Sequence, residues 1–208
     1  MKIHDISWPL SSATTSYKDK KTISFESLKN FEHHHVRETL LTLSTHSGTH
    51  IDAPSHFLAE GKTIEQVPIS STVGPCKVFD LSAIKEGISR KDLEELPINE
   101  NDIILFKTRN SKYSPTDSFN PNFVYLTLSG AQYLAACNIR AVGIDYLGIE
   151  RNQEGHATHT TLFNNNITII EGLRLDAIAA GSYFLCCLPL KIIGIEAAPA
   201  RAILIEEL

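Results

Sequence analysis

The sequence predicts an α/β protein with a mixed, barrel-like β core and a few peripheral helices. A chain of 208 residues without an evident linker fits one large domain over residues 1–208. Its content of 42% hydrophobic and 21% charged residues is typical of a globular protein with a substantial core. Short apolar segments that favour strands outnumber the segments with helical signals, so most of the core is expected to be sheet.

The expected elements follow from local patterns along the chain. Strands are predicted at 3–6, 37–44, 77–81, 102–108, 141–144, 167–171, 183–190, 191–195 and 201–205, where apolar residues run together or alternate. Helices are predicted at 89–96, 129–137 and 158–163. The first two helices begin at capping pairs, Ser89 with Asp92 and Ser129 with Gln132.

Composition excludes several classes of protein. The net charge of −5 argues against a nucleic-acid partner. No apolar stretch approaches the length of a membrane span, and residues 1–10 lack the features of a signal peptide. The four cysteines form no C-x-x-C pair, which favours reduced, buried thiols. A cytoplasmic protein is therefore expected.

The main functional candidate is residues 46–57, H-S-G-T-H-I-D-A-P-S-H-F. In an extended chain His50 and Asp52 lie on one face, because alternate side chains point the same way. His46 and His56 can join them if the chain bends at the intervening glycine and proline. A single histidine in a strand is most often structural, but three histidines and an aspartate around such a bend indicate ligands for a divalent ion.

This segment resembles the HxGTHxDxPxH signature of the metal-dependent cyclase family, which includes bacterial-type arylformamidases (kynurenine formamidases) and isatin hydrolases. Weaker similarity extends from about Asp5 to Leu204. The resemblance implies a swivelling β/β/α fold. Two segments depart from the family pattern: residues 11–25 lack its Pro-Gly-Asp element, and Glu196-Ala197-Ala198-Pro199 replaces its Asp-Gly-Ser-Pro.

The resemblance also implies roles for individual residues. It implies that His46, His50 and Asp52 are metal ligands and that His56 is the catalytic base and acid. In the second half of the chain, His159 and Glu171 match a downstream His and Glu of the family and are the other expected ligands. Without the resemblance, Glu171 would be interpreted as a solvated carboxylate at the end of a strand.

The expected activity is metal-dependent hydrolysis of a small amide, most like N-formylkynurenine, which yields kynurenine and formate. An isatin-type cyclic amide or a lactone is the alternative substrate, and a non-catalytic metal-dependent protein that binds a small ligand is the alternative from another class. One or two divalent ions, Zn or Mn, fit the N and O ligands. The resemblance further implies a homodimer or a higher homo-oligomer.

Several polar residues have no assigned role at this stage. His33, His34 and His35 are expected on the surface or at the pocket rim, because neighbours in an extended chain point to opposite faces. Asp145 follows a predicted strand and fits either a structural or a site role. His156 is expected beside the site, with a ligand role as its alternative.

Overall fold

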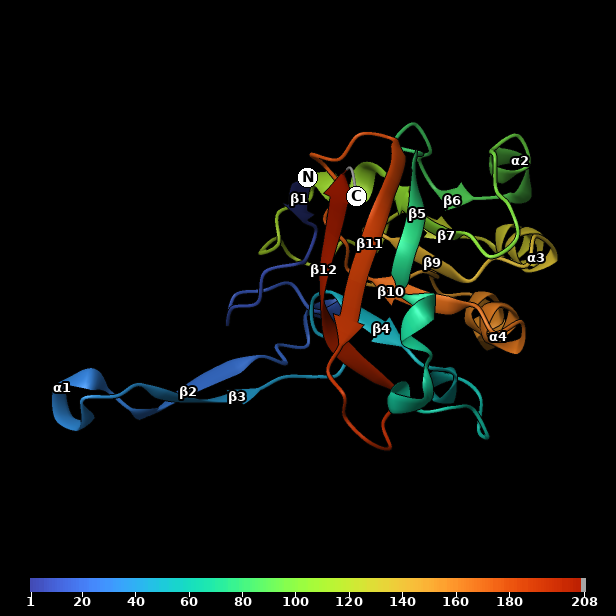
Figure 1. Cartoon of the computed structure of the whole chain (residues 1–208). Coiled ribbons are helices and arrows are strands. Elements are labelled where there is room, and N and C mark those ends of the chain that lie inside the picture. Colours follow the sequence, from blue (N-terminus) through green and yellow to red (C-terminus); the bar gives the residue numbers. More distant parts are fainter. Residues whose placement is uncertain (207–208) are drawn as a thin grey trace.

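Seven strands close into a mixed barrel in the computed structural model, which describes residues 1–206 (Figure 1). The closure arises because β4 pairs with β10 on one side and with β12 on the other. In order around the barrel the strands are β12 (Ala197–Glu206), β11 (Gly181–Pro189), β5 (Val73–Asp80), β7 (Ile103–Lys107), β9 (Ala141–Ile144), β10 (Thr168–Glu171) and β4 (His50–Asp52). An eighth strand, β1 (Lys2–Asp5), pairs antiparallel with the C-terminal part of β12. The predicted fold class is confirmed.

The parallel strands β5, β7, β9 and β10 form the wall that the helices cover. Successive side chains of β7 point to opposite faces of this wall. Leu105 belongs to the apolar core inside the barrel, whereas Ile104 and Phe106 pack toward the helices. The helices α2 (Arg90–Leu93), α3 (Leu128–Ala136) and α4 (Ala157–Asn164) all lie on this outer side (Figure 1). Strands buried on both faces explain the continuous apolar runs of the sequence.

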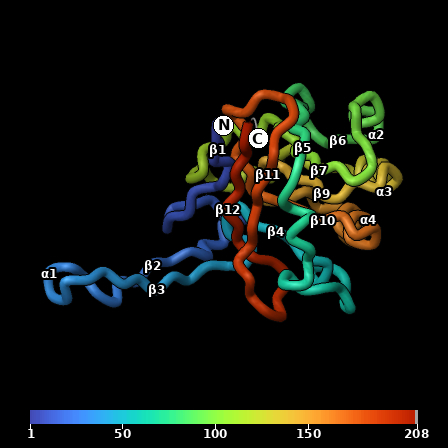
Figure 2. The backbone as a smooth tube through the Cα atoms, viewed as in Figure 1, coloured from blue at the N-terminus to red at the C-terminus, as the bar shows by residue number. Residues whose placement is uncertain are grey.

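A two-stranded hairpin extends away from the barrel, and we call residues 24–42 the arm (Figure 2). The arm consists of β2 (Ser24–Lys29), the helical turn α1 (Phe31–His34) and β3 (Glu38–Thr42), and within residues 1–206 β2 pairs with β3 alone. Its tip carries His33, His34 and His35, which are exposed. A second short pairing joins β6 (Gly87–Ile88) to β8 (Tyr125–Leu126) in parallel.

The structure corrects three details of the predicted elements. Residues 191–195 form the connection between β11 and β12 instead of a strand. The strand β2 was not predicted from its polar sequence. Helix α3 begins at Leu128, because the Thr127 hydroxyl accepts the backbone N–H of Gly130 and caps the helix in place of Ser129. The Ser89–Asp92 capping box is confirmed.

Asp145 has a structural role. Its buried carboxylate accepts the backbone N–H and the hydroxyl of Thr108, each at 2.7 Å. It also accepts the N–H and the hydroxyl of Ser111, at 3.0 and 2.6 Å. Because all four contacts are to one loop, Asp145 fixes that loop to the end of β9.

Within residues 1–206 there is no helix long and apolar enough to cross a membrane.

Candidate metal centre

The strand register explains how distant residues meet at one end of the barrel. β4 and β10 pair antiparallel with Glu171 opposite His50. Asp52 lies two residues after His50, so both side chains point to the same face of the sheet. His159 comes from helix α4, which packs against this end of β10. Four side chains therefore converge from three elements.

Asp52 is the centre of the cluster. Its Oδ1 lies 3.0 Å from Nδ1 of His46 and 3.4 Å from Nε2 of His50, and its Oδ2 lies 3.6 Å from Nε2 of His159. The carboxylate of Glu171 lies 3.4 Å from both Nε2 of His50 and Nε2 of His159. The two oxygens of Asp52 thus face different histidines.

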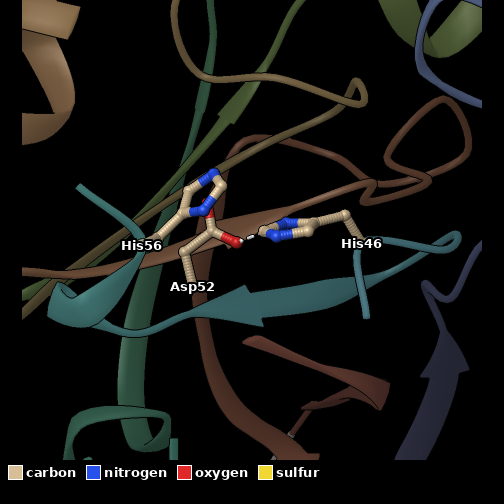
Figure 3. Close-up of side chains that lie close together, drawn as sticks. All are labelled: His46, Asp52 and His56. Atoms are coloured by element: carbon tan, nitrogen blue, oxygen red, sulfur yellow. Dashed lines mark ion pairs between the residues drawn. The ribbon is translucent and has the colours of Figure 1, made fainter. Parts of the chain in front are cut away.

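The loop after β4 brings His56 over this cluster. Residues Pro54–His56 form one turn of 3-10 helix, and Figure 3 shows His46, Asp52 and His56 directed toward one another. Each of the three offers a ligand atom within 4.8 Å of the others. The ring of His56 lies 4.2 Å from that of His46, centroid to centroid. His56 therefore lies beside the predicted ligands. This position is compatible with a role as a metal ligand and with a role in proton transfer.

The atoms that face the centre of the cluster fit a cation. Nδ1 of His50 donates to the carbonyl of Gly48 at 2.9 Å, so its other ring nitrogen, Nε2, faces two carboxylates and would offer its lone pair to a bound cation. Among residues 1–206, neither that Nε2 nor the two oxygens of Asp52, all of them buried, have a hydrogen-bond partner. Buried polar atoms normally have partners, and a divalent ion between these N and O atoms would supply one. The donor set therefore fits a divalent metal.

The electrostatics of the cluster also favour positive charge at its centre. Burial alone lowers the pKa of His50, but contact with Glu171 and Asp52 outweighs it and raises this pKa to about 9. In the same way, the carboxylates of Asp52, Glu150 and Glu171 raise the pKa of His159 against burial. Burial and the charge of Asp52 raise the pKa of Glu171, yet His159 and His50 hold it at about 2. Two buried carboxylates stay ionised because cationic groups lie beside them.

Two further carboxylates contact the histidines from outside the cluster. Glu150 is buried, with its Oε2 3.1 Å from Nδ1 of His159, and it accepts the backbone N–H of the same residue. Glu196 Oε1 accepts the hydroxyl of Thr45 at 2.7 Å and lies 3.4 Å from Nε2 of His46. No local sequence pattern marks Glu150 as a site residue, because it lies in a loop nine residues before His159. Glu196 is marked in the sequence by its position at the start of Glu-Ala-Ala-Pro, where the family pattern has Asp-Gly-Ser-Pro.

The remaining histidines lie beside the centre or far from it. His156 contacts Oε1 of Glu150 and stacks on Phe57 at 4.3 Å between ring centroids, so it belongs to the wall of the site. His33, His34 and His35 lie at the tip of the arm, where none of them contacts the cluster.

We expect Glu150→Gln to weaken metal binding, because Glu150 orients the ring of His159. Removal of a carboxylate behind a metal-binding histidine typically costs about 10–100-fold in metal affinity. Calorimetric titration of the metal-free protein with Zn²⁺ or Mn²⁺ measures this loss. Glu154→Gln, an exposed neighbour, is the matched control and should bind as the wild type does. Equal affinity in both variants would contradict the role of Glu150.

We expect Gly172→Ala to destabilise the metal centre through the backbone. Gly172 has φ +70°, and a Cβ there would lie 2.2 Å from the carbonyl oxygen of Gly48, the acceptor for His50. Unfavourable φ and the clash together should lower the free energy of unfolding by about 1–3 kcal/mol. Gly155→Ala is the control, because Gly155 has φ +63° and nothing within 4 Å of an added Cβ. Denaturant unfolding should show a larger loss at Gly172, and equal losses would argue against the clash.

Sequence comparison finds the Cyclase family pattern over residues 4–151. Kynurenine formamidase of Maricaulis maris (strain MCS10) is 36% identical over 172 residues, which cover 82% of this chain and 81% of that protein. Kynurenine formamidase of Bacillus thuringiensis (strain Al Hakam) is 33% identical over 202 residues, 96% of this chain and 95% of that protein.

Structural comparison agrees with the sequence match. A predicted metal-dependent hydrolase from Bacillus stearothermophilus superposes with a TM-score of 0.88 at 43% identity, covering 98% of this chain and 97% of that one. Isatin hydrolase A from Labrenzia aggregata, bound to benzyl benzoate, shares the fold with a TM-score of 0.85 at 23% identity, covering 99% and 94% of the two chains. The match over most of the sequence and the identity to full-length relatives lead to one conclusion: the chain belongs to the Cyclase family.

Proposed function

We propose that this protein is a metal-dependent hydrolase that cleaves N-formylkynurenine to kynurenine and formate. The observation that carries the proposal is the convergence of His46, His50, Asp52, His159 and Glu171 on one buried point, with His56 beside it. Relatives named kynurenine formamidase align over most of the chain and support the choice of substrate.

The five converging residues would hold one or two divalent ions. We propose His46, His50 and Asp52 for one ion and Asp52, His159 and Glu171 for the other, because the oxygens of Asp52 face both sets. Zn²⁺ and Mn²⁺ both accept imidazole and carboxylate ligands. When bound, such ions polarise a carbonyl group and make water a stronger nucleophile at neutral pH.

His56 is proposed to move the proton during hydrolysis. Burial and the nearby histidines lower the pKa of His56, while Asp52 acts in the opposite direction. His56 is therefore neutral near pH 7 and can accept a proton as the oxygen of water attacks the formyl carbon. The C–N bond then breaks, and His56 returns the proton to the amine nitrogen. Water and amide are thereby converted into formic acid, which releases its proton to become formate, and the free arylamine.

A pocket of about 320 Å³ opens over the cluster and would hold the substrate. Its walls include the aromatic side chains of Tyr17, Phe57 and His156, which suit a flat aromatic ring. Lys18 and Lys20 lie at the same pocket, where they offer positive charge to a substrate carboxylate. An anionic arylamide fits this combination.

The choice of substrate is tested by parallel assays. Metal-loaded protein should hydrolyse N-formylkynurenine with the largest kcat/KM among N-formylkynurenine, isatin and simple lactones. A larger kcat/KM for isatin would move the protein to the cyclic-amide alternative. Both N-formylkynurenine and isatin should be measured, because the pocket residues Tyr17, Lys18 and Lys20 come from the segment that departs from the family pattern. Bound metal without turnover of any of these substrates would favour a binding protein.

We further propose that the enzyme acts in the cytoplasm as a homodimer. The four cysteines are free. Cys76 and Cys187 are buried as expected, whereas Cys137 and Cys186 are only half-buried. Residues 1–208 are proposed to act together as one metal-hydrolase unit, because the ligands come from both halves of the sequence.

A further inference from the structure

A second cavity, of about 190 Å³, adjoins the turn that carries His56, and we call it the β10 cavity. Its wall includes Pro54, the first residue of that turn, and Thr168, the first residue of β10. Thr168 lies three residues before Glu171, which is about 10 Å along the strand. Among residues 1–206, no residue lines both this cavity and the pocket over the metal centre. The β10 cavity is therefore a separate site.

Two cationic side chains line the β10 cavity, and no carboxylate of the described chain lines it with them. Arg140 comes directly before β9, and Lys62 lies in the loop that follows the His56 turn. Within residues 1–206 neither side chain forms an ion pair, and the buried Nε of Arg140 has no hydrogen-bond partner. The cavity thus holds two positive charges that the protein itself does not neutralise.

The surroundings of Arg140 leave its guanidinium directed at the cavity without an acceptor. The backbone N–H of Arg140 donates to the carbonyl of Asp102 at 2.8 Å. The carboxylate of Asp102 is engaged elsewhere, because it accepts Nζ of Lys77 at 2.6 Å and the N–H of Asn99 at 2.7 Å. Gly74 gives the guanidinium room, since a Cβ there would lie 3.3 Å from Nη2 of Arg140. A buried donor without a partner is costly, so an acceptor in the cavity would stabilise it.

The rest of the lining is polar as well. The hydroxyl of Ser70 and the side-chain amide of Asn166 lie at the exposed rim, and neither forms a hydrogen bond within residues 1–206. The buried part of the wall contains Ser71 and Thr168, which are 5% and 7% exposed. The Thr168 hydroxyl donates to Oγ of Ser71 at 2.9 Å. The free groups of the cavity are thus mainly hydrogen-bond donors, which suit an oxyanion.

We propose that the β10 cavity binds a phosphate group. A phosphate carries close to two negative charges, which match Arg140 and Lys62, and its several oxygens accept the planar fork of a guanidinium. A carboxylate carries one charge and would leave one of the two cations unmatched. The cavity is smaller than the roughly 300–1,000 Å³ of sites that enclose a whole organic ligand. It therefore suits inorganic phosphate or the phosphate end of a larger molecule.

A bound phosphate would also hold the turn that carries His56. The backbone N–H of Ser55, in that turn, donates to the carbonyl of Lys62 at 3.0 Å. Arg140 is fixed to the barrel, because its carbonyl accepts the N–H of Thr168 at 3.1 Å. A phosphate between Lys62 and Arg140 joins the loop to the barrel and restrains the turn with it. The amide of Ser55 should therefore exchange with solvent more slowly when phosphate is bound.

Calorimetric titration with inorganic phosphate tests the site, on metal-loaded protein without free metal in solution. Wild type should bind with a dissociation constant of about 1 mM or below. Arg140→Gln and Lys62→Gln should each raise this constant by about 10-fold or more, because each removes a charged hydrogen-bond donor. Lys91→Gln is the control, since Lys91 is an exposed lysine on α2 and does not line the cavity.

Wild type that binds no phosphate would overturn the proposal. Wild-type affinity in both Arg140→Gln and Lys62→Gln would also overturn it, because the phosphate would then lie elsewhere, such as at the metal centre. Thermal unfolding identifies a variant that has lost its fold, and Lys62 is exposed, so its substitution supplies a folded variant. Phosphate should raise the Tm of wild type and of Lys91→Gln more than that of the two cavity variants.

The source of the phosphate is distinguished by comparing ligands. Tighter binding of glycerol 3-phosphate than of inorganic phosphate would identify a phosphorylated metabolite, and the reverse order would identify the free ion. Acetate that bound more tightly than both would refute a phosphate site. Hydrogen exchange tests the link to the turn, and an unchanged rate at Ser55 in the phosphate-saturated protein would refute it. None of these measurements uses hydrolysis, so their outcome is independent of the proposed function.

Discussion

Asp52→Asn is expected to abolish metal binding and to reduce hydrolysis by about 1,000-fold or more. Mutation of a residue that only orients a metal ligand typically costs about 10–100-fold in metal affinity or activity. Asp52 is itself a proposed ligand and contacts three histidines directly. Loss of its charge also leaves those buried imidazoles without their central carboxylate, so the metal-free variant should lose about 3–5 kcal/mol of stability. Elemental analysis, activity and denaturant unfolding measure the three effects.

The control for this variant is Asp176→Asn, which removes an exposed carboxylate from the loop after β10. It should keep the metal content, activity and stability of the wild type. Unfolding curves identify any Asp52→Asn preparation that is not native. A folded Asp52→Asn protein that retained full metal content would show that Asp52 is not the shared ligand.

His56→Ala is expected to lose activity by about 100–10,000-fold while it keeps its metal, because general acid–base catalysis typically contributes that much. A base must be deprotonated to act, and burial holds the pKa of His56 below its usual 6.5. Wild-type activity should therefore fall only as the pH drops below about 6.5, through this lowered pKa. Residual activity of the variant should lack that acid limb.

His4→Ala provides the matched loss of an imidazole outside the centre, since His4 lies on β1 and contacts Glu206. It should leave turnover and the pH profile unchanged. A His56→Ala protein that lost its metal would make His56 a ligand, as its position near His46 and Asp52 also permits. Full activity in this variant would exclude His56 from proton transfer.

The sequence predicted much of this centre because its main features are local. The spacing of His50 and Asp52 on an extended segment places both on one face of a strand, and β4 has that geometry. The apolar runs that became β7, β9 and β10 were likewise visible, because they are buried on both faces. His159 and Glu171 required the family resemblance, since no local pattern shows that two distant elements meet at β4.

The features that were missed depend on tertiary structure. Glu150 acts through a contact with His159 that only the packing of α4 creates. Strand β2 has a polar sequence and is exposed on both faces, so it lacks the alternation by which a strand is recognised. The predicted strand at 191–195 is apolar, but it forms a turning connection whose hydrophobic residues stay on the surface. In each case neighbours outside the segment decide the outcome.

The most direct test of the metal centre is a crystal structure of the metal-loaded protein, with anomalous scattering recorded at the absorption edge of the bound metal. We expect a peak between His46, His50 and Asp52, or between Asp52, His159 and Glu171, with ligand distances of about 2.0–2.3 Å. An active, metal-replete crystal whose anomalous peaks all lie away from these five residues would contradict the account.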